Sequence, residues 1–215
     1  MNKETTKQKK QTSQPTLDMR DIARSGHVTR WHSVRTGRDQ TLAEHHYMVA
    51  MIVNHLAGRI FGDGITPDQR LTLMEYALWH DAPELLMGDL PSPLKRRVEQ
   101  LCPGSANPLA QIEQQIAPGI VSLREKLQEF PPGMILIKLA DLMDGVHFIS
   151  QEGIGHHAKQ VCLQLRAQFI DTVNRAVGEY PKYPWPVAKE LLDQMENGAG
   201  NQVAFEGVSL KTFAY

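Results

Sequence analysis

Residues 133–149 read GMILIKLADLMDGVHFI, a segment that is apolar on nearly every side of a helix. A helix that is apolar all round is normally buried, so the segment predicts a central helix on which the others pack. Within it, Asp141 follows Lys138 by about one helical turn. A salt bridge explains this pair, and so does a metal ligand with a phosphate-binding cation beside it.

Helix-start signals recur along the rest of the chain. Thr41 precedes Glu44 in the pattern of a capping box, and proline follows a capping residue at Thr66, Ser92 and Asn107. No stretch alternates convincingly as a strand, although residues 203–205 and the last few residues could form an extended arm. The sequence therefore predicts an all-α fold. The expected helices lie near residues 17–25, 42–61, 67–82, 93–101, 108–116, 119–128, 133–151, 157–178 and 186–196.

Length and composition favour one packed domain. The chain has 215 residues, of which 41% are hydrophobic and 22% charged, and its net charge of −1 provides no global field for nucleic acid or an anionic membrane. Cys102 and Cys162 lack the spacing of a zinc site or a disulfide scaffold, so a reducing cytoplasm is the expected compartment. No apolar run approaches the ~18 residues that a membrane span requires.

The two ends of the chain differ from its middle. Residues 1–16 carry lysines among polar residues and no large apolar side chain after Met1, so we expect a flexible tail. Residues 17–197 hold all the expected helices and form the predicted domain. Residues 198–215 are a C-terminal extension.

The helix expected over residues 42–61 carries two adjacent histidines. His45 shares an apolar face with Val49 and Ile52, so it points inward, whereas His46 is expected to point toward solvent. A lone inward histidine is more often a hydrogen-bonded core residue than a metal ligand. On this evidence alone the core role is favoured.

The next predicted helix ends in His80 and Asp81. Asp81 falls on the row of Ala77 and Leu78, the side expected to face the core, where an ionised carboxylate is costly unless it is paired or binds a metal. Adjacent helical residues point about 100° apart, so both side chains can reach one cavity from two sides. A capping aspartate and a half-exposed histidine are the alternative.

In their order along the chain, these residues resemble the HD superfamily of metal-dependent phosphohydrolases, an all-helical family with the ligand pattern H…HD…D. Further blocks look like the branch that contains bacterial 5′-deoxynucleotidases and phage deoxyadenosine triphosphate (dATP) triphosphohydrolases. The resemblance covers roughly residues 17 to 180. Its blocks are Arg30-Trp31, Ala43-Glu44-His45, His80-Asp81-Ala82-Pro83-Glu84, Gly88-Asp89-Leu90-Pro91-Ser92-Pro93-Leu94-Lys95 and Lys138-Leu139-Ala140-Asp141.

The resemblance implies an HD-domain helical bundle in which His45, His80, Asp81 and Asp141 hold one divalent metal ion. Two imidazoles and two carboxylates suit Co²⁺, Mn²⁺, Zn²⁺, Fe²⁺, Ni²⁺ or Mg²⁺. Four protein ligands leave positions on a six-coordinate ion for water and a phosphate oxygen.

It also implies two acidic catalytic residues. Glu84 would orient or deprotonate the attacking water, or protonate the leaving oxygen, and it lies on the same helix as Asp81 or on the turn after it, depending on whether Pro83 ends the helix. Asp89 would position the water or the ribose. A solvated glutamate at a helix end and an Asx-turn aspartate are the ordinary alternatives.

The remaining implied residues contact the substrate. Arg30, Lys95 and Lys138 would bind phosphate. Trp31 would pack against the sugar and exclude a 2′-hydroxyl, although a core tryptophan explains it nearly as well from local sequence. Ser33 lies in the segment near the base, where a small polar residue weakens strict selectivity for adenine.

The implied reaction breaks the bond between the 5′ oxygen and phosphorus of a 2′-deoxynucleotide. The blocks at residues 30–34 and 41–45 favour a phage-type triphosphohydrolase acting on dATP or other deoxynucleoside triphosphates, releasing deoxynucleoside and triphosphate, over a 5′-deoxynucleotidase acting on monophosphates. The resemblance further implies a homo-oligomer, and the composition predicts a cytoplasmic protein with no membrane and no stable nucleic-acid partner.

The sequence leaves two other functional classes as alternatives. A non-catalytic helical module could keep a structural metal and bind nucleic acid through its tail or through Lys95-Arg96-Arg97, but such a module has no use for Glu84. Hydrolysis of cyclic dinucleotides or guanosine tetraphosphate, found in other HD branches, is disfavoured by the Arg30-Trp31 block.

Overall fold

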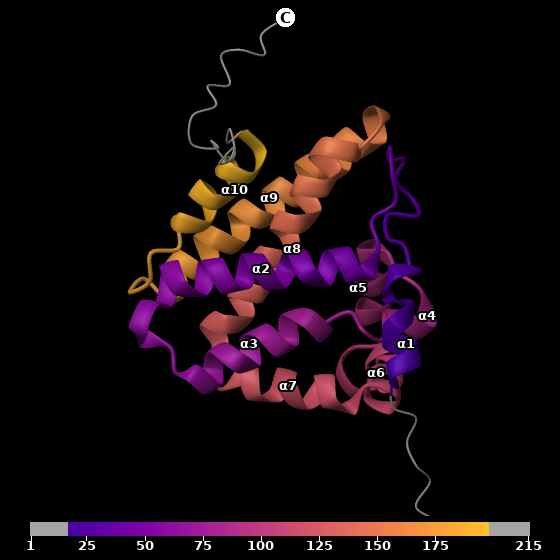
Figure 1. Ribbon diagram of the computed structural model, residues 1–215, viewed down its shortest axis with the longest axis horizontal. Helices are drawn as coiled ribbons and strands as arrows, with labels where there is room; N and C mark the ends of the chain where they lie inside the picture. Colours follow the sequence, from indigo (N-terminus) through magenta and orange to yellow (C-terminus); the bar gives the residue numbers. More distant parts are fainter. Residues whose placement is uncertain (1–16, 198–215) are drawn as a thin grey trace, which may run out of the picture.

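The computed structural model describes residues 17–197, and all regular secondary structure within them is helical (Figure 1). Two isolated β-bridges join Thr29 to Thr41 and Thr36 to Gly153, and the described residues form no strand. The all-α prediction is confirmed. The expected tail at residues 1–16 and extension at 198–215, with its arm, lie outside the described residues.

The helices follow the order that the sequence predicts, with one short addition, α4. Their bounds are α1 Met19–Ala23, α2 Leu42–Phe61, α3 Pro67–Trp79, α4 Glu84–Met87, α5 Ser92–Leu101, α6 Pro108–Ile116, α7 Pro118–Gln128, α8 Pro131–Glu152, α9 Gly155–Glu179 and α10 Val187–Asn197. Within residues 17–197, none of these helices has the length and apolarity of a membrane span.

The capping residues explain where the two helices that carry the histidines begin. Thr66 and Gln69 form a complete capping box at the start of α3. At the start of α2, Thr41 Oγ1 accepts from the Glu44 amide at 3.2 Å, but the Glu44 side chain pairs with Arg38. The expected capping box at Thr41 is therefore only half formed.

Helix α8 is the central helix that its sequence predicts. It packs against α2, α3, α7, α9 and α10, and Leu136, Leu139 and Met143 are fully buried along it. In Figure 1, α2 crosses the middle of the molecule, with α3 and α7 on one side and α9 and α10 on the other. Helices α2 and α8 pack together, and near the start of α2 their polar residues His45 and Asp144 are in contact.

The far end of α2 packs into an aromatic cluster, which comprises Phe61, Phe130, Tyr183 and Trp185. The Phe61 ring meets each of the other three edge-on, at centroid distances of 5.0, 4.9 and 5.9 Å. Trp185 is fully buried, and its indole nitrogen donates to the Tyr180 carbonyl at 3.0 Å. The proline-rich corner around Trp185 is therefore structural.

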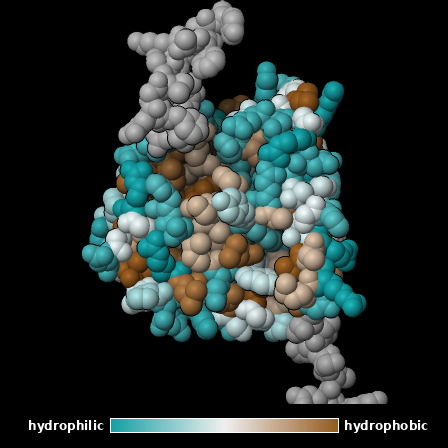
Figure 2. Space-filling model, viewed as in Figure 1, coloured by the Kyte–Doolittle hydropathy of each residue, from teal (hydrophilic) through white to brown (hydrophobic). Residues whose placement is uncertain are grey.

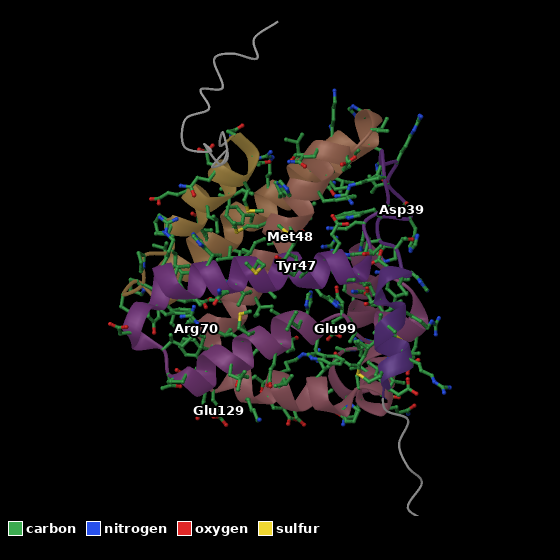
Figure 3. The ribbon with its side chains drawn as sticks, viewed as in Figure 1. Asp39, Tyr47, Met48, Arg70, Glu99 and Glu129 are labelled. Carbon is green, nitrogen blue, oxygen red and sulfur yellow. The ribbon has the colours of Figure 1, made fainter. Side chains whose placement is uncertain are left out.

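Polar contacts hold the helices together at the surface. Arg70, which Figure 3 labels on α3, donates to the Asn54 side chain on α2 at 2.7 Å. The face shown in Figure 2 mixes hydrophilic and hydrophobic groups, and Tyr47 and Met51 are among the exposed apolar side chains of α2. Exposed apolar residues are usual on a protein surface.

Candidate active site

His45 lies at the start of α2, fully buried on the face that also carries Val49 and Ile52. Its Nδ1 lies 2.6 Å from Asp144 Oδ2 on α8. A carboxylate accepts hydrogen bonds, so Nδ1 carries the hydrogen and Nε2 presents a bare lone pair. The inward orientation of His45 is confirmed, and its outer nitrogen is free to bind a cation.

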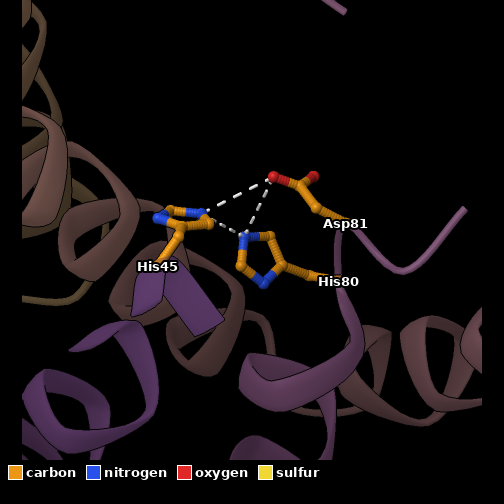
Figure 4. Close-up of side chains that lie close together, drawn as sticks. All are labelled: His45, His80 and Asp81. Carbon is orange, nitrogen blue, oxygen red and sulfur yellow. Dashed lines mark hydrogen bonds and ion pairs between the residues drawn. The ribbon is translucent and has the colours of Figure 1, made fainter. Parts of the chain in front are cut away.

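His80 is set in the same way by a backbone group. It caps the C-terminal end of α3, and its Nδ1 donates to the Ala77 carbonyl at 2.9 Å. Its Nε2 therefore also presents a lone pair, which faces His45 Nε2 at 3.2 Å (Figure 4). Burial lowers the pKa of His80 and so favours the neutral ring. Two lone pairs at this distance repel each other unless a proton or a metal cation lies between them.

Asp81 completes a three-residue cluster. Its Oδ2 lies 3.5 Å from His80 Nε2 and 3.6 Å from His45 Nε2 (Figure 4). Although burial alone would raise the pKa of Asp81, His80, His45 and Lys95 together lower it well below its usual range. One ligand atom from each of the three residues lies within 4.8 Å of the others, a donor set that fits a divalent metal.

A positive charge is favoured at this point. Burial and the Arg30 charge lower the pKa of His45, but the hydrogen bonds to Asp144 and Asp81, together with the Asp144 charge, leave it raised. The second proton that this raised pKa favours would sit on the nitrogen that faces Asp81. A metal ion bound by the ligand atoms of His45, His80 and Asp81 would supply positive charge at the same place as that proton.

Asp141, the fourth expected ligand, lies at the edge of the cluster. Its Oδ1 is 3.8 Å from His45 Nε2, and its Oδ2 accepts from Lys138 Nζ at 2.7 Å. Burial raises its pKa, but the charges of Lys138, His45 and His80 together outweigh burial and leave the pKa low, so the carboxylate is ionised. The salt bridge and the position beside the metal donors are therefore both present.

Two details of the sequence interpretation are wrong. Helix α3 ends at Trp79 rather than residue 82, and Leu78 is 45% exposed, so the row assigned to the core faces partly outward. Asp81 reaches the site from the turn after the helix. Its side chain therefore approaches along a different direction from the one that a continuous helix would give.

His46 is buried, which corrects the expectation that it faces solvent. The turn after α3 covers it, and its ring lies 5.8 Å from the His45 ring and 5.4 Å from the His80 ring, between centroids. Burial lowers its pKa to about 3, and its Nε2 has no hydrogen-bond partner. The position of that turn was not predictable from the pattern of α2 alone.

Glu84 is the first residue of α4 and is almost fully buried. Lys95 Nζ contacts its Oε1, and the same nitrogen lies 3.8 Å from Asp81 Oδ1. Its other carboxylate oxygen, Oε2, is buried without a partner. Burial, aided by the Asp81 charge, raises the pKa of Glu84 to about 8. The solvated helix-end alternative is thereby excluded.

A cavity of about 410 Å³ opens beside the cluster. The turn after α3, the α4–α5 loop, α8 and α9 form its walls together with the segment at residues 30–34. Its lining includes Asp81, Asp141 and Asp89. It also includes all the residues expected to bind substrate, which are Arg30, Trp31, Ser33, Lys95 and Lys138. A second cavity of about 460 Å³ lies on the Glu84 side, and Asp81 and Lys95 line both.

Carboxylates hold Arg30 at the mouth of this cavity. Its Nε lies 3.8 Å from Asp89 Oδ1, and its Nη1 lies 3.5 Å from Asp144 Oδ2. The Arg30 Nε atom is buried and has no hydrogen-bond partner. An anionic ligand in the cavity would find a guanidinium that is already oriented.

Trp31 forms part of the cavity wall, and its backbone is strained. Its φ is +67°, a conformation that costs about 1–2 kcal/mol for a residue with a side chain. The indole ring stacks on Phe148 with centroids 6.4 Å apart and planes 8° apart, and its nitrogen donates to Gln40 Oε1 at 2.7 Å. Strain of this kind persists where surrounding contacts impose it.

The sequence model of a family described as "5'-deoxynucleotidase YfbR-like" matches residues 19–143. The chain belongs to this family. It is 30% identical over 189 residues to a dATP triphosphohydrolase of Acinetobacter phage SH-Ab 15497, covering 83% of this chain and 91% of that protein. It is 31% identical to a 5'-deoxynucleotidase of Cronobacter sakazakii, covering 65% of each protein.

A solved structure supports the same assignment of the YfbR-like protein. The cyanophage S-2L HD phosphohydrolase, bound to dA and one catalytic Zn²⁺ ion, matches with a TM-score of 0.69 and 28% identity. The match covers 85% of this chain and 96% of that one. The HD-domain bundle expected from the sequence is confirmed.

Two residues of this YfbR-like site were missed by the sequence analysis. Asp144 is buried against His45, and its position three residues after Asp141 in an apolar helix was a readable signal. Gln40 is buried between Trp31 and Asp144, and nothing in the local sequence distinguishes it.

Proposed function

We propose that this protein hydrolyses the bond between the 5′ oxygen and phosphorus of 2′-deoxynucleotides, using one divalent metal ion. The observation that carries the proposal is the pair of Nε2 atoms of His45 and His80, which face each other at 3.2 Å beside Asp81 at the cavity. The catalytic Zn²⁺ and dA recorded for the S-2L relative support it. We assign the activity to residues 17–197.

The metal would be held by His45, His80, Asp81 and Asp141. When bound, a divalent ion lowers the pKa of a water molecule and offsets charge on the phosphoryl group. Asp144 fixes the tautomer of His45 that leaves Nε2 free, as a carboxylate behind a ligating histidine commonly does. The same donor set suits Zn²⁺, Co²⁺, Mn²⁺, Fe²⁺, Ni²⁺ or Mg²⁺, and an experiment must identify which of these ions binds.

The acidic residues near the cluster would handle the proton. Glu84 has one carboxylate oxygen on Lys95 and one without a partner, so it can accept from a water molecule or donate to the leaving oxygen. Asp89, which lies 3.8 Å from Arg30, would position the water or the ribose. Asp81 lines both of the cavities that these residues face.

The cations and the indole ring would bind the nucleotide. Arg30, Lys95 and Lys138 all line the cavity and would contact the phosphates. Trp31 presents its ring to the same cavity, where it would pack against the sugar and leave a 2′-hydroxyl without a partner. Ser33 lines the same cavity and would lie near the base, where a small polar side chain does not favour strict selectivity for adenine.

We favour a triphosphate substrate, dATP or another deoxynucleoside triphosphate, which would yield deoxynucleoside and triphosphate. The phage dATP triphosphohydrolase relative aligns over 91% of its length, and the Cronobacter 5'-deoxynucleotidase over 65%. Hydrolysis of deoxynucleoside monophosphates is the second candidate, and the family description favours it. A cytoplasmic homo-oligomer without a nucleic-acid partner remains our prediction.

A substrate panel tests the proposal. The purified full chain would be incubated with Mn²⁺, Co²⁺ or Zn²⁺ and with deoxynucleoside mono- and triphosphates and the matching ribonucleotides. Release of triphosphate supports the favoured substrate, whereas release of phosphate from monophosphates alone supports the second candidate. No metal-dependent turnover of any deoxynucleotide would contradict both and favour the non-catalytic module.

A further inference from the structure

Gln40 lies between the cavity wall and the buried side of the metal cluster. Its side-chain Oε1 accepts from the Trp31 indole nitrogen at 2.7 Å, and its Nε2 donates to Asp144 Oδ2 at 2.9 Å. That same Asp144 oxygen accepts from His45 Nδ1 at 2.6 Å. An unbroken row of hydrogen bonds therefore runs from Trp31 to His45.

Each link in this row has only one possible direction. An indole nitrogen can only donate, and an ionised carboxylate can only accept. The residue between them must present an acceptor on one side and a donor on the other, as a glutamine amide does. Gln40 and Asp144 are each 1% exposed, so water cannot substitute for either partner.

The backbone around Gln40 is fixed as well. The Arg30 amide donates to the Gln40 carbonyl at 2.9 Å, which ties the segment carrying Trp31 to the residue before Thr41 and α2. Trp31 itself stands at φ +67°, so its contacts must compensate the strain. The hydrogen bond to Gln40 is its shortest polar contact.

We propose that Gln40 is a positioning residue that couples the Trp31 wall of the cavity to the metal ligand His45 through Asp144. The coupling rests on the proposed metal site. Because Trp31 and His45 are held by one hydrogen-bond row, a change at the wall alters how His45 Nε2 is directed. The metal-binding strength of the cluster therefore depends on a side chain that does not itself reach the metal.

The test measures metal affinity rather than turnover. Zn²⁺ or Co²⁺ affinity would be determined by competition with a chromophoric chelator for the parent, Trp31→Phe, Gln40→Met and the double variant. Phenylalanine keeps a stacking ring and removes only the donor. Gln164→Ala is the matched control, because Gln164 lines the same cavity from α9 and has no part in the row.

We expect Gln40→Met to weaken metal binding by roughly 10-fold, the lower end of the range for residues behind metal ligands. Trp31→Phe should weaken it by about 3-fold in the parent and not at all once Gln40 is methionine. Gln164→Ala should bind as the parent does. If circular dichroism shows that the Gln40 variants do not fold, the metal affinity of Trp31→Phe compared with that of Gln164→Ala still tests the coupling.

Two outcomes separate the two proposals. A parent that binds one ion with an affinity unchanged in Trp31→Phe would overturn the coupling and leave the proposed function standing. Equal losses from Trp31→Phe in both backgrounds would overturn it too, because independent effects add. A parent that binds no divalent metal would instead contradict the proposed function.

Discussion

The two ends of α2 are both buried, yet they differ in whether their buried polar groups have hydrogen-bond partners. At its C-terminal end Phe61 meets three aromatic rings, and the indole hydrogen of Trp185 has a partner. At its N-terminal end, the Nε2 atoms of His45 and His80 face each other at 3.2 Å, where a proton or a metal cation must lie between them, and Glu84 Oε2 has no hydrogen bond. Unpaired buried polar groups cost stability, so the N-terminal end is shaped for a ligand and the C-terminal end for the fold.

The largest contrast should appear in activity at the N-terminal end. Asp81→Asn keeps the shape of the side chain but removes the negative charge that faces both imidazoles. We expect metal-dependent hydrolysis of deoxynucleotides to fall by roughly 10³-fold or more, with the far-UV circular dichroism unchanged. Initial rates at saturating metal measure the loss. A variant with parental rates would remove Asp81 from the site.

Stability should respond most at the C-terminal end. Phe61→Ala empties the centre of the aromatic cluster and should lower the free energy of unfolding by about 3–5 kcal/mol. Tyr47→Ala, on the exposed side of the same helix, should change it by less than about 0.5 kcal/mol. Urea unfolding measures both. Equal losses would show that α2 is not anchored at that end.

Sugar selectivity should show a smaller effect at the cavity wall. If Trp31 packs on the ribose, a 2′-hydroxyl buried without a partner costs about 1–3 kcal/mol, or one to two powers of ten in kcat/KM. The parent should prefer a deoxynucleotide by that factor, and Trp31→Ala should narrow the ratio. Steady-state rates on dATP and ATP provide the measurement. Equal parental rates on both sugars, or a ratio unchanged in the variant, would assign selectivity to another part of the cavity.

The smallest effect is a pH dependence of the metal-free protein. Burial and Asp81 raise the pKa of Glu84 to about 8 from its ordinary 4.5. Between those values the folded chain keeps a proton that the unfolded chain releases, so stability falls as pH rises across this window. Glu84→Gln lacks that proton exchange. Its melting temperature should therefore fall less than the parent's between pH 5 and pH 8.

A change of about 1 kcal/mol in the free energy of unfolding shifts the melting temperature by roughly 2–4 °C for a chain of this size. Thermal unfolding of both proteins in a metal chelator gives the difference directly. Identical pH profiles for the two proteins would mean that Glu84 is ionised in the folded state.

The sequence predicted the fold well because its signals are local. Thr66 and the apolar pattern of residues 133–149 act through capping and burial within one helix, and both are found as expected. The predicted end of α3 was wrong because His80 and Asp81 leave the helix before Pro83. Tertiary contacts, rather than the local sequence, determine where this helix ends. His46 was misassigned for the same reason, since a turn from another segment covers it.

The sequence predicted which candidate ligands lie together, but not the buried residues that hold them in place. The spacing of His45, His80 and Asp81 matches a family pattern, so one sequence was enough to pick them out. Asp144 stands out as an acidic residue in an apolar helix, but its hydrogen bond to Gln40 joins residues about a hundred positions apart, and no local pattern records that contact. Such partners become visible only when the helices are packed.

The central claim is that a divalent ion lies between His45 and His80. Equilibrium dialysis against Zn²⁺ followed by metal analysis tests it most directly, using the parent, His80→Ala and His55→Ala. His55 is an exposed histidine of α2, outside the cluster, and controls for the loss of an imidazole. We predict one ion per chain in the parent and in His55→Ala, and less than about a tenth of an ion in His80→Ala. One tightly bound ion in all three proteins, or none in the parent, would contradict the claim.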